Sequence, residues 1–240
     1  MILPLRDTLR TTRPPVVTRY LIAANCLVFL YGKTLSEQGL TSLFGAYGVV
    51  PAFLTRPDYW NTYDSIWEMF VPLLSSAFLH GGLFHLFSNM WTLWIFGKGV
   101  EDRMGKFRFL LFYLLCGILS MLVHVLTNLS SPIPAIGASG AIAGIMGAYL
   151  VLFPRSMVIS LVLIVCFPIF VPIPAVVYLV LWFASQLFNG AVSQLSPMHG
   201  GGIAWWAHVG GFLTGMWMYR AFLLRRKGRR SRRESELLSD

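Results

Sequence analysis

The chain has 240 residues, of which 56% are hydrophobic and 12% charged, and its formal net charge is +9. A soluble globular domain is about a quarter charged, so this composition excludes a soluble protein and indicates a surface that faces lipid. A bilayer core of about 30 Å needs roughly 20 apolar residues per helix, which leaves room for about six spans and short loops.

Six apolar runs follow one another along the chain. They are residues 17–32, 71–96, 107–127, 135–153, 157–188 and 202–224. Because they are long and nearly free of charge, we expect membrane-spanning helices. The fifth run has about 32 residues and three prolines. It predicts either two spans or a loop followed by one span from about Pro172.

The distribution of positive charge decides between these alternatives. With six spans, all lysines and arginines except Lys33 and Arg56 fall on one side of the membrane. Splitting the fifth run would move the basic C-terminal end to the other side. The positive-inside rule therefore predicts an all-α, polytopic bundle of six transmembrane helices with both termini in the cytoplasm.

This topology divides the chain into three parts. Residues 1–16 form a cytoplasmic segment, 17–224 form the six-helix domain, and 225–240 form a basic cytoplasmic tail. We interpret the tail as a flank that contacts anionic lipid headgroups, and not as a nucleic-acid site. The outer loop, about 33–70, is rich in aromatic residues, which suit the membrane interface.

The acidic residues exclude several kinds of membrane enzyme. None of the ten lies in the middle of a predicted span. This argues against an aspartyl intramembrane protease and against proton-coupled transport through a buried carboxylate. The sequence has no His-Glu-x-x-His motif, so we expect no metal and no cofactor.

Polar side chains of three different runs lie at one predicted depth. Ser139 is early in the fourth run, His208 is early in the sixth, and His80 and His85 are early in the second. All fall within roughly 5–15 Å of the outer face. Serine alone is a common helix-contact residue in membranes. With a histidine in hydrogen-bond reach it becomes a candidate nucleophile, and His208 is the candidate base.

Glycines provide a means to bring these two residues together. Gly140, Gly144 and Gly147 share one face of the fourth helix, while Gly211 and Gly215 share the face of the histidine on the sixth. Small residues on both faces let two backbones approach closely. The alternative, that they are packing stripes only, leaves the serine and histidine unexplained.

His85 and Asn89 are four residues apart, so they share one helical face. Both can donate hydrogen bonds to a developing oxyanion, together with the backbone N–H of Ser139. The alternative is that they only hold helices together. We expect His80 to support the outer loop and His124 to be structural or interfacial.

Four motifs in this order resemble those of rhomboid intramembrane serine proteases, over about residues 16–224. They are His80-Gly-Gly-x-x-His85-x-x-x-Asn89, Glu101-Asp-Arg103-Met-Gly105, Gly137-Ala-Ser139-Gly140 and Ala207-His208-Val-Gly-Gly211-x-x-x-Gly215. The resemblance implies a Ser139–His208 dyad without a carboxylate, and an oxyanion hole of His85, Asn89 and the Ser139 amide. It also implies that Glu101 and Arg103 brace the cytoplasmic end of the second helix.

Two positions depart from the family pattern. Many rhomboids have Trp-Arg in the first loop, whereas the nearest match here is Trp67-Glu68. Many bacterial members have a tyrosine that stacks on the catalytic histidine, and Ala143 occupies that position. Neither change removes a catalytic group.

The sequence thus predicts a serine endopeptidase of a bacterial plasma membrane, with membrane lipids and transmembrane proteins as its partners. By resemblance, it cleaves these substrates near the outer end of their span. One alternative is a catalytically silent rhomboid-like protein that binds membrane proteins. Another is a small-solute or ion channel, which the apolar inner halves of the spans disfavour.

Overall fold

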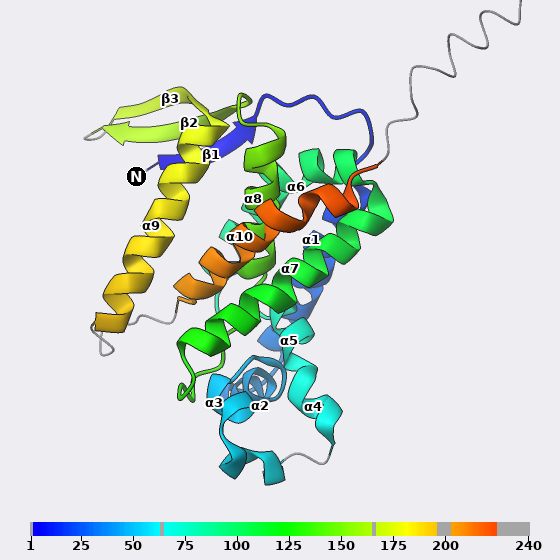
Figure 1. Cartoon of the computed structure of the whole chain (residues 1–240), viewed down its shortest axis with the longest axis vertical. Coiled ribbons are helices and arrows are strands. Elements are labelled where there is room, and N and C mark those ends of the chain that lie inside the picture. Colours follow the sequence, from blue (N-terminus) through cyan, green and yellow to red (C-terminus); the bar gives the residue numbers. More distant parts are fainter. Residues whose placement is uncertain (1, 63–64, 165–166, 196–202, 225–240) are drawn as a thin grey trace, which may run out of the picture.

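The structure, a computed structural model, describes residues 2–62, 65–164, 167–195 and 203–224. A bundle of long helices carries a small sheet at one end and a group of short helices at the other (Figure 1). The long helices are α1 (Val16–Lys33), α6 (Leu83–Met104), α7 (Lys106–Thr127), α8 (Ser139–Leu152), α9 (Ala175–Leu195) and α10 (Trp205–Phe222). The short ones are α2 (Glu37–Tyr47), α3 (Pro51–Thr55), α4 (Ile66–Phe70), α5 (Pro72–Ser75) and the 3₁₀ turns Pro57–Thr62 and Ser76–Phe78.

Three of the described helices, α1, α7 and α9, are long and apolar enough to cross a membrane. A fourth span arises if Trp67–Phe78 and α6 are counted as one bent unit, since 79° separates them. α8 is apolar but shorter, with 14 residues. The protein is therefore a mostly helical membrane bundle with three to four candidate spans by length and composition.

The second predicted run, 71–96, is not one helix. The short helix α5 and a 3₁₀ turn precede the break, and α6 begins at Leu83 after the extended Gly82. Two adjacent glycines, Gly81 and Gly82, lower the helical preference at the bend. At its other end, α6 stops at Gly105, whose φ of +76° suits a residue without a side chain.

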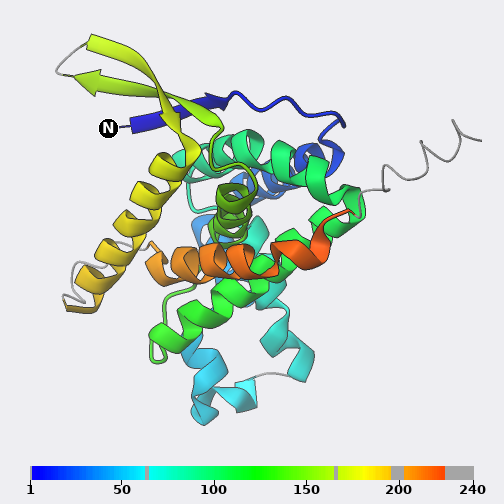
Figure 2. The same ribbon diagram turned by 45° about the horizontal axis from the view of Figure 1, so that its top comes forward.

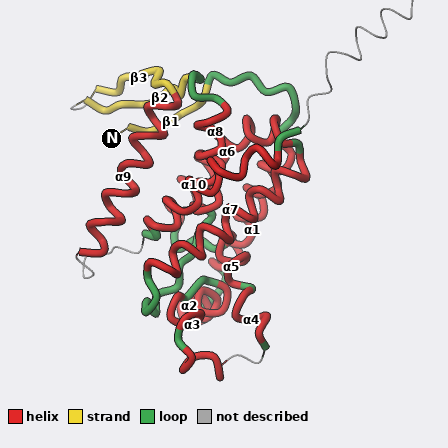
Figure 3. The backbone as a smooth tube through the Cα atoms, viewed as in Figure 1, coloured by secondary structure: helices red, strands yellow, loops and turns green. Residues whose placement is uncertain are grey.

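The fifth run corrects the prediction of an all-α fold. Its first part forms an antiparallel hairpin of β2 (Met157–Ile164) and β3 (Phe167–Pro174), and β1 (Ile2–Asp7) pairs with β2 (Figure 3). The sheet order is β1-β2-β3, so the prolines of β3 lie on an edge strand, where a missing N–H is tolerated. A helix begins only at Ala175, so the run holds one helix, as one alternative predicted, but two strands precede it in place of the predicted loop.

α8 occupies the middle of the bundle. Figures 1 and 2 show it between α6, α7 and α10. Its residues from Gly140 to Tyr149 are all buried. The chain before it is held by backbone pairing of Val49 with Ala135. Non-helical backbone is tolerated at membrane depth when protein surrounds it, so Ser139 can begin its helix inside the molecule.

Candidate active site

Ser139 and His208 meet at the point where two central helices begin. Ser139 is the first residue of α8, and His208 lies in the first turn of α10. The serine Oγ is 2.8 Å from Nε2 of the histidine. The Ser139 hydroxyl is thus within hydrogen-bond reach of an imidazole nitrogen, which is the geometry that an activated nucleophile requires.

Glycines on both helices make this approach possible. A Cβ atom added to Gly211 would collide with the carbonyl oxygen of Gly140, and one added to Gly215 would collide with that of Gly144. In the other direction, a Cβ on Gly147 would collide with the carbonyl of Phe212. Real side chains cannot occupy such positions, so the α8–α10 contact needs glycine at each of them.

The second ring nitrogen of His208 also has a partner. Nδ1 lies 2.8 Å from Oε1 of Gln186, a residue of α9 whose exposed fraction is 5%. Gln186 was not among the residues predicted for the site from the sequence. A signal was present, since a glutamine within an apolar span needs a polar partner.

Two tryptophans surround the imidazole of His208. The ring of Trp182, on α9, lies 5.9 Å from it, and the ring of Trp205, on α10, lies 6.1 Å away and meets it edge-on. Ala143, where many rhomboids have a stacking tyrosine, is fully buried in α8. In this protein the aromatic neighbours of the histidine therefore come from α9 and α10.

His85 and Asn89 lie beside the segment that leads into Ser139. A Cβ atom added to Gly137 would be 2.7 Å from Nε2 of His85 and 3.8 Å from Nδ2 of Asn89. The φ of Gly137 is +123°, a conformation that glycine adopts readily. Among the described residues, Nδ2 of Asn89 has no hydrogen-bond partner although it is buried. Such a donor costs about 1–3 kcal/mol when unpaired.

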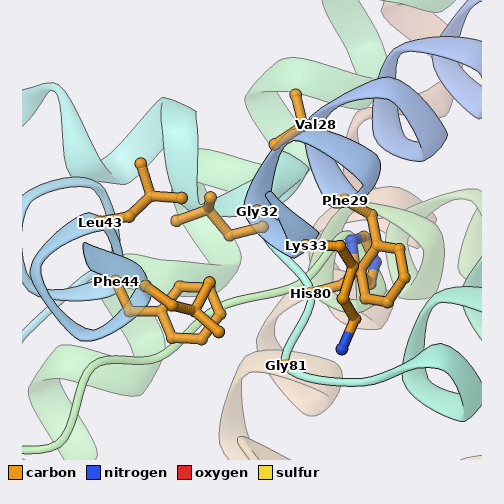
Figure 4. A pocket seen from close by; sticks show the side chains of 10 residues that line it. Val28, Phe29, Gly32, Lys33, Leu43, Phe44, His80 and Gly81 are labelled. Atoms are coloured by element: carbon orange, nitrogen blue, oxygen red, sulfur yellow. The ribbon is translucent and has the colours of Figure 1, made fainter. Parts of the chain in front are cut away.

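His80 packs behind this group. It is buried, and its ring meets that of His85 edge-on at 5.0 Å. Figure 4 shows it in a pocket with Phe29 and Lys33 of α1 and Phe44 of α2. His80 thus lies between the α6 end of the site and the short helix α2.

Glu101 and Arg103 lie at the other end of α6. The Glu101 carboxylate accepts hydrogen bonds from the backbone N–H groups of Val17 and Thr18, both at 2.9 Å, and caps the start of α1. The guanidinium of Arg103 lies over the ring of Phe153, 5.9 Å from its centre. These residues join α6 to α1 and to the end of α8, and they do not contact Ser139.

Two further predicted residues, His124 and Trp67, have no hydrogen bond to Ser139 or His208 among the described residues. Nδ1 of His124 is 3.3 Å from the amide of Asn128, one helical turn further on. Trp67, from the Trp-Glu pair of the first loop, has an exposed fraction of 75%.

The fold and the site define a class: a helical membrane protein with a serine–histidine pair inside its bundle. The family model of the Rhomboid domain matches residues 64–226. This match covers more than half of the chain, so the protein belongs to the rhomboid family.

Curated relatives carry the same family name. The "Presenilin-associated rhomboid-like protein, mitochondrial" of Mus musculus is 27% identical over 82% of this chain and 46% of its own length. The "Rhomboid protein 1, mitochondrial" of Saccharomyces cerevisiae is 28% identical over 78% of this chain and 54% of its own length. The "Rhomboid protease GluP" of Bacillus subtilis is 34% identical over 60% of this chain and 26% of its own length. The chain thus spans about half the length of the mitochondrial relatives and less of the third.

Proposed function

We propose that this protein is an intramembrane serine endopeptidase that cleaves transmembrane proteins near the outer end of their span. The observation that carries the proposal is the 2.8 Å contact between Ser139 Oγ and His208 Nε2 inside the bundle. Membership of a family that includes a named protease supports it.

In the proposed reaction, Nε2 of His208 takes the proton of Ser139 as Oγ attacks the peptide carbonyl. The protonated histidine then gives this proton to the leaving amine as the C–N bond breaks, which leaves an acyl ester on Ser139. Water, deprotonated by the same nitrogen, hydrolyses the ester and restores the hydroxyl. The cycle needs no carboxylate, metal or cofactor.

The oxyanion formed during attack would accept hydrogen bonds from three donors. These are Nδ2 of Asn89, Nε2 of His85 and the backbone N–H of Ser139, which opens α8. The first two flank Gly137, two residues before the nucleophile. Donors that are already placed and poorly solvated stabilise such a charge strongly.

We place the reaction below the outer membrane face. α8 has 14 residues, and at 1.5 Å per residue it is about 21 Å long, compared with a bilayer core of about 30 Å. If its far end reaches the inner face, Ser139 lies on the order of 10 Å below the outer one. Six spans, with both termini in the cytoplasm and an outer loop over about 33–70, fit this depth.

The relatives bear on the kind of membrane in which the protein resides. Two of the named relatives are mitochondrial and the third is from a Bacillus. We propose a bacterial plasma membrane, or a mitochondrial membrane with the same sidedness. Transmembrane proteins and lipids would be the partners.

The alternative within the family is a catalytically silent protein that binds membrane proteins. The Ser139–His208 contact favours the protease, because a binding protein has no need of a serine hydroxyl on a histidine ring. The channel interpretation receives no support from the fold, since α8 fills the middle of the bundle with buried side chains.

The test is labelling of the purified protein in detergent by a serine-reactive fluorophosphonate, together with cleavage of a reporter. The reporter has one transmembrane helix with small and helix-breaking residues near its outer end. Wild-type protein should react in both assays. Ser139→Ala and His208→Ala should each lose roughly 10³-fold or more in kcat, and the double variant should be little worse.

Ser42→Ala is the matched control, since Ser42 is exposed in α2, and it should retain full activity. Normal turnover by Ser139→Ala would contradict the mechanism. Absence of both labelling and cleavage in the wild type would favour the silent, binding protein.

A further inference from the structure

His208 is held between two side chains that contact opposite nitrogens of its ring. Nε2 faces Ser139 Oγ, and Nδ1 faces Oε1 of Gln186, each at 2.8 Å. A neutral imidazole carries one proton, so one nitrogen donates and the other accepts. It can act as base for Ser139 only when the proton is on Nδ1. If the Gln186 atom that faces Nδ1 is an acceptor, the ring proton is held on Nδ1 and Nε2 can take the proton of Ser139.

The surroundings of Gln186 fix the orientation of its amide. Nε2 lies 3.2 Å from the backbone carbonyl of Trp182 and 2.9 Å from Oγ of Ser185. A carbonyl can only accept. The Ser185 hydroxyl donates its own proton to that same carbonyl at 2.6 Å, so toward Gln186 its oxygen also accepts.

Both neighbours thus require a donor, which only the NH₂ group of the amide provides. The reversed orientation would place Oε1 against two acceptors. The observed orientation leaves Oε1 as the atom that faces His208, and this oxygen can only accept. Nδ1 must then carry the ring proton, and the lone pair of Nε2 is directed at the hydroxyl of Ser139.

We propose that Gln186 is a positioning residue that holds His208 in the tautomer able to take the proton of Ser139. This inference rests on the proposed protease function. A third residue that orients the histidine is a recurring element of serine hydrolases, where it is commonly a carboxylate. Here a neutral amide fixes the ring without adding a charge to an apolar interior. With an exposed fraction of 5%, Gln186 is buried, and polar side chains in such places need their hydrogen bonds satisfied.

The first test compares three variants on α9 in the cleavage assay. Gln186→Leu removes the acceptor and should lower kcat roughly 10- to 100-fold, as expected when a catalytic group is misoriented, with little change in KM. Gln186→Glu keeps an oxygen toward Nδ1 but turns a second oxygen toward the two acceptors, so it should recover only part of the kcat that Gln186→Leu loses. Gln194→Leu is the matched control. Gln194 is exposed and bonds to the backbone of Thr127 on α7, so wild-type kcat is expected.

The second test reads the tautomer without turnover. Protein labelled with ¹⁵N-histidine is measured by NMR in detergent at a pH where His208 is neutral, and its signals are assigned by their loss in His208→Ala. Wild type should show a protonated Nδ1 and an unprotonated Nε2. Gln186→Leu should show a mixture or the reverse.

The outcomes separate the two proposals. If wild type cleaves the reporter and Gln186→Leu has the same kcat, the positioning role is wrong and the protease function stands. If wild type does not cleave, the protease function fails, and the NMR measurement still tests the tautomer. A proton on Nε2 in wild-type protein overturns the inference even if the Gln186→Leu variant does not fold.

Discussion

Asn89 carries a buried amide donor without a partner among the described residues, beside the segment that leads to Ser139. An unpaired donor costs stability in the resting protein. The same donor is ready to stabilise an oxyanion at no further reorganisation. The unpaired donor of Asn89 thus lowers the stability of the resting protein but favours the proposed reaction.

Asn89→Ala should therefore lower kcat by roughly 10- to 1000-fold, as expected for one oxyanion donor among several. Its melting temperature should be equal to or above that of wild type, because the unpaired donor is gone. Cleavage kinetics and thermal unfolding in detergent measure the two effects. If only the melting temperature changed, Asn89 would be a packing residue.

The sequence predicted some of these residues and missed others for physical reasons. Ser139 and His208 could be paired because topology placed them at one depth and glycines marked the contact. Gln186 and Trp182 were not predicted because their partner, His208, belongs to another helix. The spacing of residues within α9 does not indicate this contact. The rotation of α9 that turns both toward the imidazole is decided by tertiary packing.

The site depends on the close packing of α8 against α10. Backbone carbonyls of α8 occupy the space that side chains at Gly211 and Gly215 would need. Either helix can accommodate a larger residue only by moving away from its partner. Such a movement would also separate Oγ of Ser139 from Nε2 of His208.

Gly211→Val and Gly215→Val should each destabilise the protein by roughly 1–3 kcal/mol or more and abolish cleavage. Thermal unfolding and reporter cleavage in detergent provide the measurement. Gly45→Val is the control in α2, since a Cβ at Gly45 would meet no atom within 4 Å. Unchanged melting temperatures for both α10 variants would mean that this glycine face looks toward lipid.

Hydropathy predicted the helices well where the runs were uninterrupted, as for α1 and α7. It failed at the hairpin β2–β3, because a continuous apolar run has no periodicity that separates a buried strand from a helix. The β-branched residues of 157–164 and the prolines of 167–174 were the available signals. The break before α6 was not predicted, because the apolar residues before Gly81 and Gly82 fit a helix that continues into α6.

At the scale of the whole molecule, an ion pair between a buried carboxylate and a partly exposed lysine joins the sheet to the bundle. Asp7 of β1 has a fully buried side chain whose Oδ1 lies 2.7 Å from Nζ of Lys98 on α6. Its Oδ2 accepts a hydrogen bond of 2.8 Å from the hydroxyl of Tyr149 on α8. A strand from the start of the chain is thus joined to two helices of the core.

Asp7→Ala should destabilise the protein by about 1–3 kcal/mol, because it removes the acceptor of Tyr149 and leaves the partly buried charge of Lys98 unpaired. Thermal unfolding in detergent measures this effect. Asp58→Ala is the control, since Asp58 pairs with Arg56 at an exposed position, where an ion pair contributes about 0–1 kcal/mol. Equal melting temperatures for the two variants would show that the Asp7 ion pair contributes no more than an exposed one.

The residue stretches just before α1 and just after α10 meet at the turn between α6 and α7. The N–H of Arg13 donates to Asp102 at 2.9 Å, and the N–H of Leu224 donates to the carbonyl of Arg103 at 3.0 Å. The segment before α1 and the end of α10 therefore lie at the same end of the molecule. The short helices α2 to α5 lie at the opposite end (Figure 1).

Since the basic residues gather at the end that holds Arg13 and Leu224, that end should face the cytoplasm. Single cysteines at Arg10 and Ser42, both exposed, in a variant without the three native cysteines, test this with a membrane-impermeant maleimide. In intact bacterial cells that express the protein, Ser42→Cys should react and Arg10→Cys should react only after the membrane is opened. Reaction at both sites in intact cells would place the outer loop and the N-terminal segment on one side. Six spans with cytoplasmic termini would then be wrong, and so would the depth proposed for Ser139.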